Sequence, residues 1–319
     1  MNVSVIIPAF NAEKTIGKTL NSLLSQSVVP KEIIVVNDGS TDKTKEIVEG
    51  IAVNNNSIKL FSRKNQGISA SRNFGAGKAK EEVIAFLDSD VIVETQWLEK
   101  LLNGLQENVF AVCGKYSIES DGSLASDFFS FSINSSSFQG YNIALRKKDF
   151  LESKGFNEKM KYCEDPEFFL RAFTSGKTLN KTSAESFHES YPLKKRVKPN
   201  FNYSFFDGVL FKKNFSFFIN PFNLIKAPEN IKMIYSFYWI EFLSVILSVG
   251  VFLISKNLFS AGFLFLPSLI GIIKLISNKN QTKYKNNFLA VLVYSFFALI
   301  LFEVIKSFGF INGLIQGKL

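Results

Sequence analysis

Short apolar runs alternate with amphipathic segments over the first third of the chain, and this alternation constrains the fold more than any other feature. The apolar runs are predicted as strands over Val3–Ile7, Glu32–Val36, Ile58–Phe61 and Val83–Leu87. The segments that follow them are predicted as helices over Ala12–Ser25, Thr41–Val53, Ser69–Lys80 and Thr95–Gln106. Strands that are apolar almost throughout and alternate with helices predict an α/β fold with a parallel sheet covered on both faces.

The next part of the chain has a more mixed pattern. It predicts strands over Val109–Tyr116 and Gly140–Arg146, and a helix over Pro166–Ser175 that Gly176 ends. The Ser- and Phe-rich stretch Ser120–Ser137 is predicted as a long loop. Ligands of doubly wound sheets bind beyond the carboxyl ends of the strands, so the residues after each strand are the first candidates for a site.

Two acidic turns follow predicted strands. Asp38 follows the second strand, before Gly39, where a carboxylate can accept hydrogen bonds from a base or a ribose. Thr41 or Asp42 then caps the next helix, and an ordinary Asp-Gly turn is the alternative.

The segment Asp88-Ser89-Asp90 directly follows the fourth strand. Carboxylates at the end of a buried strand are costly without a cation, and oxygen ligands suit Mg²⁺ or Mn²⁺ shared with phosphates. The alternative is a polar turn into the following helix.

Three further features are candidates for binding or catalysis. Ser69 is predicted to cap the third helix, which places Arg72 in its first turn, where a diphosphate is favoured. Asp165, next to Glu164 before the Pro166 helix, could be a general base or a capping carboxylate. His188 is the only histidine; it is either structural or a contact to a metal or an acceptor.

Composition limits the classes of partner and of site. Two cysteines in 319 residues exclude a disulfide framework and a cysteine-based zinc site. A net charge of +9 is compatible with nucleic acid, an anionic membrane or phosphorylated ligands, and 35 Phe favour membrane contact. Because no signal peptide precedes the first strand, we expect the N-terminal domain to stay in the cytoplasm.

The C-terminal part changes character after about residue 190. Residues 191–232 interleave lysines and arginines with phenylalanines, which is typical of single-stranded nucleic-acid binding or of a membrane interface. Three apolar runs then favour the membrane and exclude nucleic acid as the expected partner: Ile234–Ser255, Leu258–Ser277 and Phe288–Phe302. We therefore expect about three transmembrane helices within residues 233–319, with buried helices of a soluble protein as the alternative.

Taken in order, these motifs resemble the inverting family 2 glycosyltransferases of GT-A fold, from Val3 to about His188. The strongest stretches are Val3–Asn11, Ile34–Asp42, Asn65–Gly75 and Phe86–Asp90. The Gly155–Glu158 stretch, followed by Glu164-Asp165 and Arg171, resembles the acceptor-side pattern of the family.

The resemblance implies roles at matching positions. A nucleotide-sugar site would be formed by Pro8, Ala9, Phe10, Asn11, Asp38, Arg72, Asp88 and Ser89. Asp90 would bind the divalent cation, Mg²⁺ or Mn²⁺, with Asp88 and His188 as further candidates. Asp165 would be the catalytic base that activates an acceptor hydroxyl.

Two departures from the family pattern indicate which kind of transferase to expect. The chain lacks the Gln-x-x-Arg-Trp motif of processive members, which favours transfer of a single sugar. Asp90 runs into Val91-Ile92-Val93-Glu94, unlike the dolichol-phosphate mannose synthases, so a polyprenyl-phosphate sugar synthase is only an alternative. A nucleotidyltransferase and an inactive membrane scaffold are two others.

The expected protein is a multi-pass membrane glycosyltransferase. It has a cytoplasmic GT-A domain over residues 1–190, an interface segment over 191–232 and a transmembrane region over 233–319. A lipid-linked or membrane-proximal glycan would be its acceptor, and membrane lipids would be partners.

Overall fold

The computed structural model describes residues 1–119, 140–189, 197–218 and 310–316. They fall into two compact units, which are described separately. The first unit comprises Met1–Ser117 and Ser135–Glu189, and the second comprises Ile118–Asn134 and Ser190–Leu319. The predicted loop Ser120–Ser137 and the three predicted transmembrane runs lie outside the described residues.

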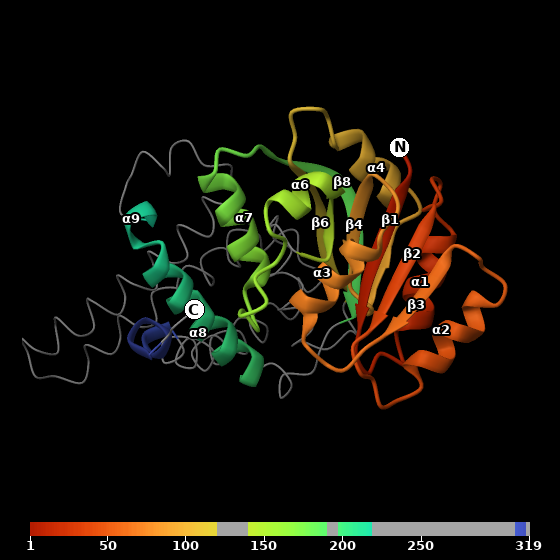
Figure 1. Cartoon of the computed structure of the whole chain (residues 1–319), viewed down its shortest axis with the longest axis horizontal. Helices are drawn as coiled ribbons and strands as arrows, with labels where there is room; N and C mark the ends of the chain where they lie inside the picture. The colour runs from red at the N-terminus through yellow and green to blue at the C-terminus, as the bar shows by residue number, and fades with distance from the viewer. Residues whose placement is uncertain (120–139, 190–196, 219–309, 317–319) are drawn as a thin grey trace, which may run out of the picture. The chain divides into compact units, whose positions relative to one another are not determined.

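Four parallel strands form one half of the sheet of the first unit: β1 (Val3–Ala9), β2 (Glu32–Asn37), β3 (Ile58–Ser62) and β4 (Val83–Leu87). They lie side by side in the order β3-β2-β1-β4 (Figure 1). The register pairs Val5 with Ile33 and with Ala85, so the strands end close together at one edge. The parallel half of the sheet is therefore as the sequence predicts.

The other half of the sheet lies beside β4 and contains antiparallel strand pairs. It consists of β7 (Asn142–Arg146), β6 (Ala111–Glu119), β8 (Leu179–Glu189) and β5 (Val91–Val93), in that order after β4. Strand β4 pairs with β7, β6 with β7 and β5 with β8, and all three pairings are antiparallel. The sequence prediction missed β5, which is very short, and β8, which is largely polar.

The helices largely follow the sequence prediction, with shifted ends. The described helices of this unit are α1 (Ile16–Leu24), α2 (Thr44–Ala52), α3 (Ile68–Lys78), α4 (Trp97–Gly104), α6 (Lys147–Glu152) and α7 (Glu164–Thr174). The short helix α6 was not predicted. Helix α7 begins at Glu164, two residues before the predicted start, because Pro166 fits within the first turn of a helix.

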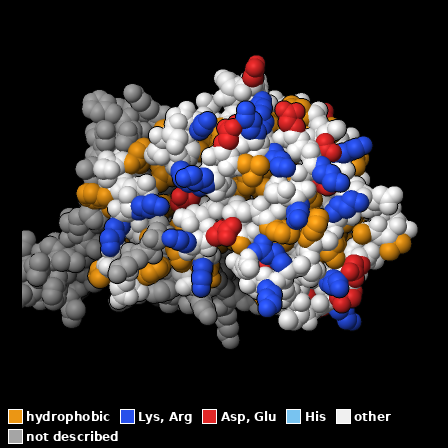
Figure 2. Space-filling view, viewed as in Figure 1, with side chains coloured by type: hydrophobic (Ala, Val, Ile, Leu, Met, Phe, Trp, Pro, Cys, Tyr) orange, Lys and Arg blue, Asp and Glu red, His pale blue; other side chains and the backbone are white. Residues whose placement is uncertain are grey.

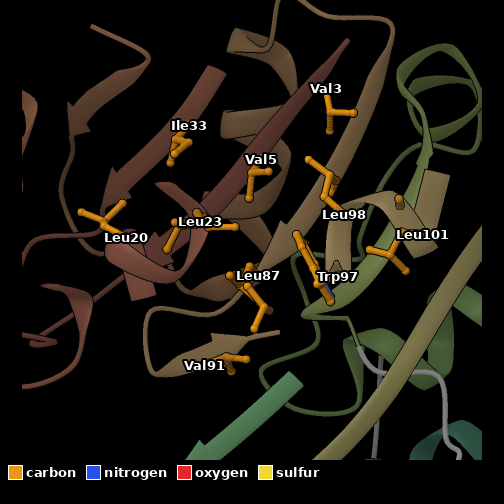
Figure 3. Packing of buried hydrophobic residues seen from close by; sticks show 14 of the residues in the cluster. Val3, Val5, Leu20, Leu23, Ile33, Leu87, Val91, Trp97, Leu98 and Leu101 are labelled. Carbon is orange, nitrogen blue, oxygen red and sulfur yellow. The ribbon is translucent and has the colours of Figure 1, made fainter. Parts of the chain in front are cut away.

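Alternate residues of the strands pack into two separate cores. On one face, Val3 and Val5 of β1 meet Leu20 and Leu23 of α1 and Trp97 of α4 (Figure 3). Side chains that are removed from water in this way supply most of the driving force for folding.

Aromatic rings fill the opposite face. The ring of Phe86 on β4 lies 5.1 Å from that of Phe150 and 5.3 Å from that of Phe156. Phe168 of α7 continues the cluster, 4.9 Å from Phe156. These contacts attach α6 and α7 to the middle of the sheet, and α7 carries the predicted base.

A buried polar network crosses the antiparallel half of the sheet. Asn142 on β7 accepts a hydrogen bond from Trp97 Nε1 at 2.7 Å. Its amide donates to Ser186 Oγ and to the Lys115 carbonyl, each at 2.8 Å. Because both hydrogens and the oxygen of this amide are satisfied, the network fixes α4, β6 and β8 around β7.

Replacing Asn142 with Ala would leave the Trp97 and Ser186 groups buried without this partner. We expect a loss of about 2–4 kcal/mol in the free energy of unfolding, because buried unsatisfied polar groups are costly. Urea unfolding followed by tryptophan fluorescence measures this. The matched control is Asn21→Ala at an exposed position of α1, expected to change the free energy by less than about 0.5 kcal/mol. Equal losses in both variants would contradict the structural importance of the network.

The second unit contributes α8 (Val197–Lys213), α9 (Phe215–Phe218) and a helix over residues 310–316 to the described residues. Gly208 of α8 and Gly313 lie where a Cβ atom would collide with the backbone of the other helix, so the two helices cross closely. None of the helices in the described parts of the chain is both long enough and apolar enough to cross a bilayer.

Candidate active site

The ends of β1 and β2 are joined by hydrogen bonds between their following turns. Asn11 adopts a left-handed conformation (φ 51°), which asparagine tolerates better than most residues. Its side-chain oxygen accepts the Thr41 N–H at 2.9 Å, and its own N–H donates to Ser40 Oγ at 3.0 Å. The side chain of Phe10, directly before Asn11, is 51% exposed. An exposed aromatic ring at the end of a parallel strand is well placed to contact a ligand.

Pro8 and Ala9 occupy a different environment from Phe10 and Asn11. Both are buried within β1, where the register pairs them with Val36 and Asn37 of β2. Of the four residues predicted to line the nucleotide pocket, therefore, only Phe10 and Asn11 expose their side chains.

Asp38 follows β2 and is 4% exposed, and it holds the backbone that leads into α3. Its two carboxylate oxygens accept the N–H groups of Gln66 and Gly67 at 3.0 and 2.8 Å. A carboxylate has about four lone-pair positions, so this arrangement leaves capacity for a ligand.

The prediction that Ser69 caps α3 is wrong. Gly67, with φ 93°, occupies the N-cap position, and no side chain caps the helix there. Asp38 instead satisfies the N–H groups just before the helix. Lys43, and not Thr41 or Asp42, occupies the N-cap position of α2, although Asp42 Oδ1 accepts the Thr44 N–H at 3.0 Å at the start of that helix.

Arg72 is the buried centre of the site. Its side chain is 1% exposed, and it donates from Nη2 to Asp88 Oδ1 and from Nη1 to Glu164 Oε1, both at 2.8 Å. The sequence placed Arg72 at an open helix end facing a diphosphate. The structure corrects this geometry: the guanidinium points inward at two carboxylates, since α3 begins one residue earlier and packs against the sheet. Burial by itself lowers the pKa of Arg72. The carboxylates of Asp88 and Glu164 raise it by more than burial lowers it, so the net pKa lies above its ordinary value and the group stays charged.

The Asp88-Ser89-Asp90 turn lies next to this arginine. Burial raises the pKa of Asp88, Arg72 opposes that rise, and the nearby Asp90 adds to it. The backbone carbonyl of Ser89 accepts a hydrogen bond from Thr19 Oγ1 of α1 at 3.1 Å, which holds the turn in place.

Asp90 and His188 lie together although they are far apart in sequence. The antiparallel register of β5 with β8 pairs Val91 with His188, which brings His188 Nε2 to 3.0 Å from Asp90 Oδ2. Carboxylate oxygen and imidazole nitrogen both occur as ligands of Mn²⁺-type ions. The described residues contain no group of three or more His, Cys, Asp or Glu side chains that could hold a metal alone. Asp90 and His188 could supply two ligands to such an ion, whereas Asp88 is directed at Arg72.

Asp165 lies in the first turn of α7 and accepts the Gly140 N–H on Oδ2 at 3.1 Å. Burial raises the pKa of Asp165 to about 7, and the adjacent Glu164 carboxylate contributes to the rise. The Gly140 N–H and Arg72 act in the opposite direction. A carboxyl group that titrates near neutral pH suits general base catalysis.

Gly140 has to lack a side chain at this position. A Cβ atom there would lie 2.9 Å from Arg72 Nη1 and 3.0 Å from Asp165 Cβ. This glycine therefore allows the backbone before β7 to approach both groups.

Two tyrosines border the site, and the sequence analysis missed them. The rings of Tyr116 and Tyr141 lie 5.4 Å apart, and Tyr116 lies 6.3 Å from the His188 ring. Burial raises the pKa of Tyr141 well above its ordinary value, with Tyr116 and Asp88 adding to the effect. No motif marks these residues, because only the pairing of β6 with β7 and β8 brings them to the carboxylates.

A cavity of about 700 Å³ opens elsewhere in this unit, beside α6 and α7. Its lining includes Gly155–Glu158 and Arg171, which the sequence analysis assigned to the acceptor-side pattern, but none of the residues predicted to bind the nucleotide sugar or the cation, and not the predicted base. The Arg171 guanidinium is already held by Glu167 and by backbone carbonyls, among them that of Gly155 at 2.6 Å. The residues predicted to bind the donor and the predicted base therefore lie outside this cavity, at the strand ends and in the first turn of α7.

Residues 4–159 match the family described as Glycosyl transferase family 2. These residues belong to glycosyltransferase family 2. The match covers the motifs from the first strand to Gly155–Glu158 that suggested this family, and it ends before Glu164-Asp165 and Arg171. The activity of the whole chain is a separate question, because the match covers about half of it.

Curated relatives match part of the chain. A protein of Campylobacter jejuni named GalNAc(5)-diNAcBac-PP-undecaprenol beta-1,3-glucosyltransferase is 32% identical over 49% of this chain and 55% of its own length. The cholesterol galactosyltransferase of Borreliella burgdorferi is 40% identical over 36% of this chain and 33% of its own length. The chain thus matches roughly a third to a half of these relatives.

Solved structures support the fold. A mannosyltransferase of Pyrobaculum calidifontis, solved with GDP-Man and Mn²⁺, superposes with a TM-score of 0.62 at 16% identity and covers 99% of this chain and 88% of its own. S. aureus TarS 1-349 in complex with UDP gives a TM-score of 0.51 at 20% identity, with 96% and 90% covered. At these identities the likeness shows the GT-A fold alone.

The raised pKa of Asp165 predicts a pH-dependent effect of Asp165→Asn on stability. An unfolded Asp165 loses its proton near pH 3.8, whereas the folded one keeps it up to about pH 7. The folded state of the wild type therefore loses stability as the pH rises through this window, and the asparagine variant does not. We expect the variant to gain on the order of 2–4 kcal/mol relative to wild type between pH 4 and pH 8. Thermal unfolding at a series of pH values tests this, and a pH-independent difference would contradict the raised pKa.

Proposed function

We propose that the chain transfers a single sugar from a nucleoside diphosphate sugar to an acceptor hydroxyl, with inversion at the anomeric carbon. The observation that carries the proposal is the convergence of Asp88 and Glu164, the residue directly before Asp165, on one buried arginine, within a family 2 domain. An acid-rich turn and a base that titrates near neutral pH are the two components that such a transfer needs.

Each part of the site has a place in this reaction. Phe10 and Asn11 would contact the nucleoside, with Asp38 accepting a hydrogen bond from its base. Asp90 and His188 would hold the divalent cation, which supplies positive charge to the leaving diphosphate when bound. Asp165 would take the proton from the acceptor hydroxyl as its oxygen attacks the face opposite the leaving group.

A lipid-linked or membrane-proximal glycan is the proposed acceptor. The name of the Campylobacter relative, which includes undecaprenol, supports a lipid-linked one. The second unit also exposes Tyr203 and Phe215 together with Lys212 and Lys213, and such a mixture of aromatic and basic side chains suits an anionic bilayer surface. We accordingly propose a multi-pass membrane protein with its catalytic domain on the cytoplasmic side.

Nucleic acid is not the proposed partner. On the face shown in Figure 2, Lys and Arg side chains are spread over the described surface with Asp and Glu between them. Electrostatic binding of a nucleic acid instead relies on basic residues that are clustered on one face or stripe.

A panel of labelled donors tests the proposal. Membranes that contain the protein would receive UDP-, GDP- and dTDP-sugars with Mn²⁺ or Mg²⁺, and parallel samples would receive EDTA. We expect one donor to give metal-dependent release of nucleoside diphosphate and label in the lipid fraction. Label on polyprenyl phosphate itself would favour the synthase alternative, and label only in soluble acceptors would refute the lipid acceptor. Turnover of none of the donors would contradict the proposed activity.

Two substitutions test the assigned roles. Asp165→Asn should lower the turnover number about 10²–10⁴-fold through loss of the base, with little change in UDP affinity. Asp90→Asn should instead weaken the Mn²⁺-dependent binding of UDP, because it removes a charged ligand. Asp149→Asn, in the first turn of α6 and away from the strand ends, is the matched control with wild-type values expected. Wild-type turnover in Asp165→Asn would refute the assigned base.

A further inference from the structure

One guanidinium connects the three elements that carry the site. Arg72 comes from α3, Asp88 from the end of β4 and Glu164 from the first turn of α7. Both ion pairs have N–O distances of 2.8 Å. The residue that follows Glu164 is the proposed base, so the position of the base depends on this bridge.

Burial makes the bridge hard to replace. The side chains of Arg72, Glu164 and Asp88 are 1%, 11% and 21% exposed, so water can substitute little for a lost partner. The arginine fork reaches two carboxylates at once, which the single ammonium of a lysine cannot do with the same geometry. Removing one partner of a buried pair leaves a charge without compensation, and such losses are large.

We propose that Glu164 is a positioning residue that, through Arg72, fixes the first turn of α7 and hence Asp165 against the Asp88 turn at the end of β4. This inference rests on the proposed function, because it assumes that Asp165 is the base. It gives Glu164 a role distinct from that of a capping carboxylate, since its Oε1 binds the arginine of another helix.

Glu164 also acts on the charge of its neighbour. Its carboxylate disfavours ionisation of Asp165, whereas Arg72 favours it. The groups that act on Asp165 are Glu164 of α7, Arg72 of α3 and Cys113 of β6, together with Tyr141 and the Gly140 N–H in the turn just before β7. Removing the Glu164 charge should therefore let Asp165 ionise at lower pH.

The position of α7 can be measured without any substrate. Cys163 is buried directly before Glu164, and Cys113, buried in β6, is the only other cysteine. In Glu164→Ala of the full chain, we expect thiol-reactive label to reach Cys163 at least about tenfold faster, because the first turn of α7 opens locally more often. The rate at Cys113, measured in the same sample by peptide mass spectrometry, should stay unchanged. Glu152→Gln, which removes only the exposed Lys148 pair on α6, is the control and should label Cys163 like wild type.

Kinetics then distinguish positioning from simple destabilisation. In Glu164→Gln, with the donor that the wild type uses, we expect the plateau turnover to fall at least about tenfold while the dissociation constant of UDP stays within about twofold. The acid limb of the rate–pH profile should move to lower pH. Arg72→Lys should lower turnover similarly, because it keeps the charge but loses the fork.

The outcomes separate this inference from the proposed function. An unchanged labelling rate of Cys163 in Glu164→Ala would overturn the positioning role, whether or not the protein transfers sugar. Unchanged turnover in Glu164→Gln, with an active wild type, would overturn it as well. A wild type that turns over no donor would refute the proposed function, and the labelling rates would still decide whether the bridge fixes α7.

Discussion

The ion pairs of Arg72 with Asp88 and Glu164 are the interaction on which the site depends. They lie in the interior of the first unit, where an uncompensated charge would be costly. Each member comes from a different element, so the pairs can form only when α3, β4 and α7 are packed correctly. Gly140, which has no side chain to keep the backbone away, completes the arrangement beside Asp165. The site is therefore complete only when these elements have folded and packed together.

The sheet explains why these groups meet. Parallel strands with helical crossovers place the turns after β1, β2 and β4 at one edge, where Asn11 and Asp38 join two of these turns and α3. The antiparallel half then adds His188 through the register of β8 with β5. The parallel strands thus carry most of the residues proposed to bind the donor, the antiparallel half adds His188, and the proposed base comes from α7.

The sequence predicted those features that depend on local pattern. Apolar runs and the residues after them were enough to place β1 to β4, the Asp88–Asp90 turn and Asp165. They were not enough for features that depend on the tertiary contacts: the inward direction of Arg72, the Asp90–His188 pair and the two tyrosines. A three-residue strand such as β5 has too short a pattern to predict, yet its register brings His188 to Asp90.

The central claim is that one carboxylate, Asp165, serves as a base in a single displacement on the donor. The configuration of the bond that the wild-type protein forms tests this claim most directly. A UDP-sugar with an α-linked diphosphate would be supplied, and the new glycosidic linkage would be assigned by NMR from the coupling of its anomeric proton. The account predicts a β linkage, because attack occurs opposite the leaving group. An α linkage would contradict it, since retention requires two displacements or attack from the same face.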